Sequence, residues 1–152
     1  MRASIQPPGV RLTSTDPMQE SSVSASISPS ETVETVRDDV IGWRRYLHQH
    51  PERSFHEERT AQFIADTLAG FGGLEITRLT PTSVIARLKG SLPGPVLAIR
   101  ADIDALPIEE RNTHDFVSRN PGVMHACGHD GHTAMLLGAV KVLVGQRDSI
   151  AG

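Results

Sequence analysis

The segment PVLAIRA (95–101) constrains the fold of this chain more than any other stretch. It is entirely apolar from Val96 to Ile99, and two aspartates follow closely in ADIDALP. A short apolar run without alternation is typical of a strand that is covered on both faces. We therefore predict a central β-strand over 95–101, which needs neighbouring strands and layers that cover both of its faces.

Apolar residues spaced by three and four positions predict two amphipathic helices before this strand. The first covers 31–50 and ends before Pro51, because the residue before a proline avoids helical geometry. The second begins at a capping-box pattern, Ser54 with Glu57, and ends at the Gly72-Gly73 pair. The apolar stripes consist of Val33, Val36, Val40, Trp43 and Leu47 in the first helix, and of Ala61, Ile64, Leu68 and Phe71 in the second.

After the second helix the sequence period changes to that of short strands. LEITRL (74–79) and SVIARLKG (83–90) are rich in β-branched residues and are bounded by turn sequences. A loop over 107–123 follows the central strand, and a helix then begins near Asp130. Its run AMLLGAVKVLV is apolar almost all round, which predicts a buried helix. This order of elements indicates the opening half of a layered α/β domain.

Composition restricts the surroundings in which the chain works. Residues 1–30 are rich in Ser, Thr and Pro and poor in large apolar residues, so we predict a disordered tail before a domain over 31–152. A net charge of −3 without a basic patch argues against nucleic acid as a partner. The sequence has no apolar run of membrane-spanning or signal-peptide length, and it has one cysteine, so we expect a cytoplasmic protein.

Asp102 and Asp104 follow the predicted strand two positions apart. Residues two apart in an extended segment point the same way, and ligands of open α/β sheets bind beyond the carboxyl ends of the strands. The pair could therefore bind a metal ion or orient a metal ligand. An acidic strand end that is solvated in a turn is an equally good interpretation.

The stretch HACGHDGH (125–132) holds three of the seven histidines and the only cysteine. Cys127 and His129 flank one glycine, so a bend can turn a thiolate and an imidazole toward one point, and zinc binds both. Asp130 is placed to cap the following helix, whose positive end would favour a Cys127 thiolate. Metal binding is a better interpretation than a buried structural cysteine, because histidine and glycine pack poorly in an apolar core. A nucleophilic Cys127 with His125 or His129 as its base stays open, although such pairs usually come from separate segments.

The other histidines give weaker signals. His48 and His50 in LHQHPE would point about 200° apart on a helix, so they do not form a metal-binding pair. We predict that one lies near the helix C-terminus, where positive charge is favourable, and that the other lies at the surface. His56 and His114 have no spacing that singles them out.

Three segments together resemble one family: WRRYLHQHPERSFHEERTA, GPVLAIRADIDALPIEE and PGVMHACGHDGHTAMLLGAV. They are similar to the N-terminal part of the metal-dependent amidohydrolases, a group that includes hippurate hydrolase, N-acyl-amino-acid amidohydrolases and indole-acetyl-amino-acid hydrolases. This group belongs to the wider class of two-metal aminoacylases and carboxypeptidases. The signature MHACGHDGH after RADIDALP is the most specific part of a resemblance that runs from about Trp43 to Val144.

The resemblance implies a zinc-peptidase-like α/β domain with a mixed sheet and helices on the sheet faces. It implies metal-dependent hydrolysis of the amide bond of N-acyl amino acids, which are small-molecule substrates. Cys127 would bridge two divalent metal ions, zinc or manganese, and His129 would bind one of them. Asp104 would be the catalytic-site aspartate that orients metal ligands, with Asp102 and Asp130 as helpers nearby.

The family pattern also implies what lies outside this chain. The glutamate base, further metal ligands and a lid domain used in dimerisation come after the position that matches Gly152. We therefore expect 31–152 to be the N-terminal part of a truncated catalytic domain, inactive alone, and we expect a homodimer for the full-length form. Two alternatives stay open, a non-catalytic remnant that binds metal and a cysteine-nucleophile hydrolase. Arg53 replaces a residue that is usually apolar in the family, which affects local packing alone.

Overall fold

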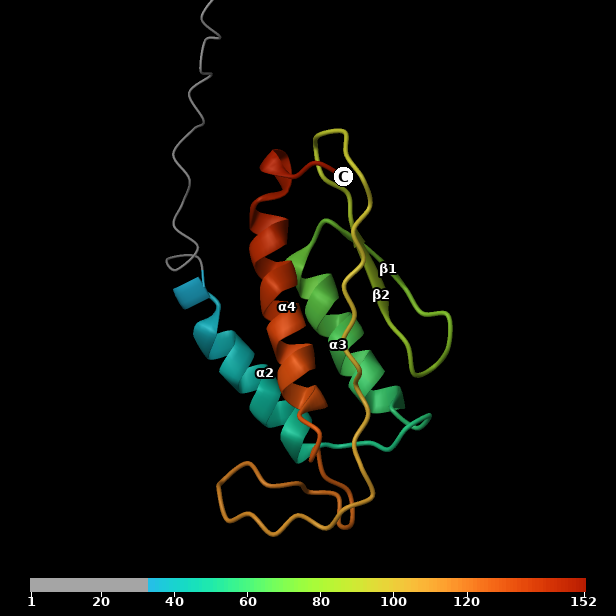
Figure 1. Cartoon of the computed structure of the whole chain (residues 1–152), viewed down its shortest axis with the longest axis vertical. Helices are drawn as coiled ribbons and strands as arrows, with labels where there is room; N and C mark the ends of the chain where they lie inside the picture. Colours follow the sequence, from blue (N-terminus) through green and yellow to red (C-terminus); the bar gives the residue numbers. More distant parts are fainter. Residues whose placement is uncertain (1–32) are drawn as a thin grey trace, which may run out of the picture.

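The computed structural model describes residues 33–152, and the tail predicted over 1–30 lies outside the described residues. The described part contains three α-helices, a two-stranded sheet and a short 3₁₀ helix (Figure 1). In chain order they are α2 (Arg37–Gln49), α3 (Glu58–Phe71), β1 (Leu74–Thr77), β2 (Ile85–Leu88), α4 (His129–Gly145) and η1 (Arg147–Ser149). Helices together with a small sheet confirm the predicted α/β class.

Helix α4 lies between α2 and α3, and the β1–β2 hairpin lies beyond α3 (Figure 1). The centre of the core consists of Ile64 and Leu68 from α3 and Leu137 from α4. Side chains of α2, the hairpin and the segment after it pack around this centre, and they include Trp43, Leu74, Val84 and Ile103. The core therefore joins all the described layers.

Helix α2 follows the predicted stripe and ends as predicted before Pro51. Val36 and Leu47 are buried, whereas Val33 at the start of the stripe is exposed. A Cβ atom on Gly138 of α4 would lie 2.5 Å from the Cγ2 atom of Val40. Contacts that close are not tolerated, so Gly138 is the residue that allows α2 and α4 to approach each other.

Helix α3 is where predicted, but its start is not capped as predicted. Neither Ser54 nor Glu57 makes a capping hydrogen bond. The backbone N–H and the hydroxyl of Thr60 instead donate to Glu52 Oε2, at 2.8 and 2.9 Å. The capping-box prediction was wrong because the carboxylate of Glu52, which lies outside the predicted pair, accepts the free N–H of Thr60. Ser54 is then available for another contact.

The hairpin matches two of the predicted strands. β1 and β2 are antiparallel, with Leu74 opposite Leu88 and Thr77 opposite Ile85. The third predicted strand, over 95–101, is not formed, and the prediction that it is buried was wrong. Val96 and Leu97 are 84% and 82% exposed. A buried central strand needs partners on both edges and layers on both faces, and the described residues provide neither.

Helix α4 begins at His129, and the loop over 107–123 precedes it as predicted. Its N-cap residue is Gly128, with φ of 82°, so the prediction that Asp130 caps the helix was wrong. The prediction of burial all round was also wrong, since Met135 is 58% exposed while Asp130 and Thr133 are buried. Asp130 and Thr133 can lie on the inward face of α4 because each makes a hydrogen bond with a neighbouring segment.

No helix over residues 33–152 is both long and apolar enough to cross a lipid bilayer.

We predict that Leu137→Ala lowers the free energy of unfolding by about 2–5 kcal/mol, because it leaves a cavity at the centre of the core. Met135→Ala, on the exposed side of the same helix, is the matched control and should change it by less than about 0.5 kcal/mol. Urea denaturation followed by circular dichroism measures both. Equal losses in the two variants would show that α4 does not pack through the Leu137 face.

Candidate functional site

Asp104 and His129 meet although 25 positions separate them. His129 Nδ1 lies 2.9 Å from Asp104 Oδ1 and 3.0 Å from the Asp104 carbonyl oxygen. The Ser54 hydroxyl donates to the other carboxylate oxygen, Oδ2. This hydrogen bond lowers the pKa of Asp104, and the bond from His129 lowers it further against the opposing effect of burial. An ionised carboxylate accepts only, so His129 must donate from Nδ1, and a neutral ring then leaves Nε2 free as a metal ligand.

A backbone contact positions Ser54 beside this pair. The Ala105 N–H donates to the Glu52 carbonyl at 2.7 Å, and Arg53 and Ala105 form a parallel bridge. The turn that follows Pro51 therefore runs alongside the end of the aspartate segment. Phe55, directly after Ser54, has φ of 67°. A non-glycine residue in this region costs roughly 1–3 kcal/mol, which the surrounding contacts must offset.

Asp102 makes other contacts than Asp104. Its side chain is 49% exposed, and it accepts a hydrogen bond from Arg100 at 2.5 Å. Its backbone carbonyl accepts the Thr133 hydroxyl at 3.1 Å, which ties the segment to α4. The two aspartates therefore have different partners, and a role for Asp102 beside the site stays a prediction.

Cys127 is an exposed free cysteine just before α4. Gly128 separates it from His129 and adopts the left-handed backbone conformation, so the predicted bend at this glycine is present. Among residues 33–152, Cys127 and His129 do not belong to any group of three metal-binding side chains within 4.8 Å of one another. The described residues thus provide at most part of a metal centre at this position.

His125 is buried, and neither of its ring nitrogens has a hydrogen-bond partner among the described residues. Burial lowers the pKa of His125 to about 4, against the attraction of the Asp130 carboxylate. His125 is therefore neutral near pH 7. The structure does not pair it with the thiol of Cys127.

Sequence reasoning missed a buried polar network that joins α2, the loop and α4. His48 Nδ1 lies 2.8 Å from Asp130 Oδ2, and Arg44 donates to the same oxygen at 3.0 Å. His48 Nε2 lies 3.0 Å from Glu110 Oε1. His50 is the C-cap residue of α2, with Nδ1 2.7 Å from the Tyr46 carbonyl oxygen. His48 lies in the last turn of the helix and is 3% exposed, and its burial among carboxylates was not predicted.

Glu110 was also missed, since an acidic residue in a predicted loop gave no signal beyond its place in ALPIEE. It accepts hydrogen bonds from the Ser118 N–H at 2.6 Å and from Asn112 at 2.9 Å, besides its contact with His48. Burial acts to raise the pKa of Glu110, but these hydrogen bonds outweigh it and lower the pKa to about 2. Glu110 is therefore an ionised, nearly buried carboxylate in the loop.

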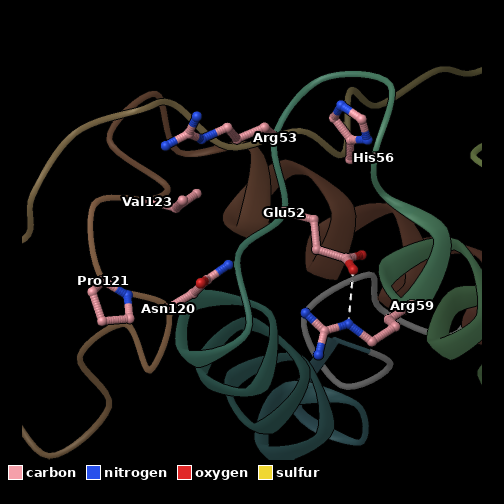
Figure 2. A pocket seen from close by; sticks show the side chains of 7 residues that line it. All are labelled: Glu52, Arg53, His56, Arg59, Asn120, Pro121 and Val123. Atoms are coloured by element: carbon pink, nitrogen blue, oxygen red, sulfur yellow. Dashed lines mark hydrogen bonds and ion pairs between the residues drawn. The ribbon is translucent and has the colours of Figure 1, made fainter.

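A shallow pocket lies at the start of α3 (Figure 2). Glu52 turns its carboxylate toward Arg59, which donates from Nε at 2.8 Å (Figure 2). Burial acts to raise the pKa of Glu52, but the hydrogen bonds from Arg59 and Thr60 outweigh it and lower the pKa. The pocket is lined by Glu52, Arg53, His56, Arg59, Asn120, Pro121 and Val123, none of which was predicted as a ligand.

The chain is similar to known proteins of one family. Residues 98–151 match the model of the peptidase family M20/M25/M40. The chain is 65% identical over 120 residues to an N-acyl-L-amino acid amidohydrolase of Geobacillus stearothermophilus, a match that covers 79% of this chain and 32% of the relative. It is 45% identical over 122 residues to thermostable carboxypeptidase 1 of Saccharolobus solfataricus, covering 79% of this chain and 31% of the relative.

A solved structure shows the same fold. It is that of the Bacillus subtilis YXEP protein, described as a dinuclear metal binding peptidase from the M20 family. The TM-score is 0.73 at 44% sequence identity, and the match covers 78% of this chain and 34% of that chain. This chain therefore spans about a third of the length of the relatives that it matches.

We predict that Glu52→Gln lowers the free energy of unfolding at pH 7 by about 1–2 kcal/mol, because the start of α3 loses its charged acceptor. The pKa of Glu52 is lowered in the folded state, so its stabilisation is complete above the ordinary value of 4.5 and is lost as the pH falls through the folded value. The difference between the wild type and the variant should therefore shrink below about pH 4.5. Denaturant titrations between pH 3 and pH 7 measure it. Glu58→Gln, exposed on the same turn, is the control, and a difference that stays constant with pH would contradict the assignment.

Proposed function

This chain is related to the metal-dependent amidohydrolases of peptidase family M20/M25/M40 over their N-terminal part, and on this premise we propose that it contributes half of a metal centre that hydrolyses N-acyl amino acids. The observation that carries the proposal is the contact of Asp104 with His129 Nδ1, which leaves Nε2 free. Metal-binding histidines commonly donate their other ring N–H to a carboxylate in this way. The exposed Cys127 lies two positions before His129 on the other side of a bent glycine.

We assign Cys127 and His129 as metal ligands and Asp104 as a positioning residue in the catalytic site. Thiolate and imidazole suit zinc, and we propose two divalent ions, zinc or manganese, as in the resemblance stated above. When bound, such ions polarise an amide carbonyl and lower the pKa of a bound water. Asp104 fixes the tautomer and the ring orientation of His129, and Ser54 holds the carboxylate of Asp104 in place. Asp102 and Asp130 have no such role in this proposal, because they contact Arg100 and His48 instead.

The names of the relatives support an N-acyl amino acid as the substrate. One relative is an N-acyl-L-amino acid amidohydrolase, and another, 47% identical, is an N-acetyl-L-cysteine deacetylase of Bacillus subtilis. In both names the bond broken joins an acyl group to the nitrogen of an amino acid. A net charge of −3 further supports a small-molecule substrate over nucleic acid, which binds through cationic residues that neutralise its phosphates. We further propose a cytoplasmic, homodimeric enzyme.

A catalytic zinc site has three protein ligands and an open position for water, and hydrolysis also needs a base. The described residues offer two ligands at this position and no base. We propose that residues 31–152 are the N-terminal part of the catalytic domain. The remaining ligands and the base then belong to the part of the relatives that this chain does not cover.

We predict that the 152-residue chain alone does not hydrolyse N-acetyl or N-benzoyl amino acids, while a chimera that continues into the remaining C-terminal part of the Geobacillus stearothermophilus relative does. In the chimera, Cys127→Ala should reduce kcat/KM by about 100-fold or more, because even neighbours of metal ligands affect activity by about 10- to 100-fold. His56→Ala, an exposed histidine outside the proposed metal ligands, is the control. Release of free amino acid is the measurement. Turnover by the short chain that a chelator abolishes would overturn the assignment of an incomplete site. Activity that alkylation of Cys127 abolishes, but a chelator does not, would favour the cysteine hydrolase.

We predict that Asp104→Asn weakens metal binding at Cys127 and His129 by about 10- to 100-fold, because the asparagine no longer fixes the His129 tautomer. Asp102→Asn is the matched control, since Asp102 faces Arg100 and should leave the affinity unchanged. Cobalt(II) titration reports this site through the thiolate-to-cobalt charge-transfer absorption, which only a Cys127 ligand can produce. Equal effects of the two variants would show that Asp104 does not act through His129.

A further inference from the structure

We propose that His48, Glu110 and His114 form a second divalent-cation site, separate from Cys127 and His129, which takes an ion of the zinc class. Among residues 33–152, these three are the one group of metal-binding side chains whose ligand atoms all lie within 4.8 Å of one another. They come from α2 and from the loop over 107–123. No sequence spacing brings them together, and none of the preceding assignments uses His114.

The two distances from Glu110 are close to those between ligands of a tetrahedral site. Glu110 Oε1 lies 3.0 Å from His48 Nε2 and 3.4 Å from His114 Nε2. Zinc binds imidazole nitrogen and carboxylate oxygen at about 2.0–2.2 Å, which places two tetrahedral ligands about 3.3 Å apart. The two distances to Glu110 Oε1 are thus close to this spacing, and the third pair, His48 with His114, lies within 4.8 Å.

His48 is oriented as a metal ligand is. Its Nδ1 lies 2.8 Å from the buried carboxylate of Asp130, which leaves Nε2 to face Glu110. A histidine whose far nitrogen is held by a carboxylate has its tautomer and ring plane fixed for metal binding. His114 is held by stacking on Phe116, with ring centroids 3.8 Å apart. Both imidazoles are thus positioned before any ion arrives.

The charges at this site favour a cation. Glu110 and Asp130 provide two carboxylates, and Arg44 offsets the charge of Asp130 at 3.0 Å. Arg45 lies with its guanidinium 5.1 Å from the centre of the Phe116 ring, so it opposes the ion from one side. The nearly buried carboxylate of Glu110 contacts the ion directly and outweighs this more distant charge. The His114 side chain is 31% exposed, which gives the ion a path from solvent and room for a water as fourth ligand.

A bound ion would fasten the loop to the helices. Glu110 and His114 belong to the loop, whereas His48 belongs to α2 and is tied through Asp130 to α4. The loop otherwise depends on hydrogen bonds such as that of Arg119 N–H to the Gln49 carbonyl at 2.9 Å. We therefore assign the ion a structural role, in which binding to the folded state raises the melting temperature.

The test uses the 152-residue chain with Cys127→Ser and His129→Ala, which removes the ligands of the other proposed centre. This variant should bind one equivalent of zinc, measured by competition with a chromophoric chelator, and zinc should raise its Tm. Adding His114→Ala should weaken binding by about tenfold or more, since even the loss of a group behind a ligand has effects of this size. His56→Ala is the matched control, an exposed histidine whose loss should change nothing. His114 is preferred to His48 for the test because its side chain is partly exposed, so its removal leaves the buried network folded.

Two results would overturn the proposal: absence of zinc binding by the Cys127→Ser, His129→Ala variant, or binding that His114→Ala does not weaken. Failure of this site and failure of the proposed function are distinguishable with cobalt(II). An ion bound by His48, Glu110 and His114 gives no thiolate charge-transfer absorption, whereas an ion at Cys127 does. If the wild type binds cobalt only with the thiolate charge-transfer absorption, and the Cys127→Ser, His129→Ala variant binds no cobalt, the second site is excluded. The proposed centre at Cys127 is then still supported.

Discussion

The buried carboxylate of Asp130 is the interaction on which the rest of this structure depends. It is 1% exposed, and one of its oxygens accepts hydrogen bonds from both Arg44 and His48 of α2. A buried charge that loses its partners is destabilising by about 3–5 kcal/mol. The rotation and the height of α4 against α2 are therefore fixed at its first turn. Gly138 lies further along the same face of α4, and there the two helices approach each other closely.

Fixing the first turn of α4 also fixes the candidate site, because His129 is the neighbour of Asp130 in the chain. Successive helical residues point about 100° apart, so Asp130 faces α2 while His129 faces the aspartate segment. His129 meets Asp104 there, and Ser54 supports Asp104 from the turn after α2. Two histidines are thus each held by a carboxylate on either side of one helix start, His129 by Asp104 and His48 by Asp130. This shared arrangement underlies both the proposed centre at Cys127 and the proposed loop site at His114.

Local sequence signals predicted the helices well and the contacts at their ends poorly. The stripes of α2 and α3 are present because each is set by spacing within one segment. The caps were wrong because Ser54 and Asp130, both good capping residues, are used over longer distances by Asp104 and His48. The predicted burial of Val96 and Leu97 was wrong. An apolar run shows that a strand could be buried, but it does not show whether other layers lie over its faces.

What the sequence by itself determined is the set of chemical groups and their local order: a thiol and an imidazole around a glycine, an aspartate segment before them, and helices on either side. These follow from composition and spacing, which need no knowledge of distant contacts. Only the tertiary structure decided that Asp104 and not Asp102 reaches His129, and that His48, Glu110 and His114 converge. The physical reason is that hydrogen bonds and metal sites depend on distances of about 3 Å between side chains. Such distances between residues far apart in the chain are set by helix packing around a buried charge, which no local pattern encodes.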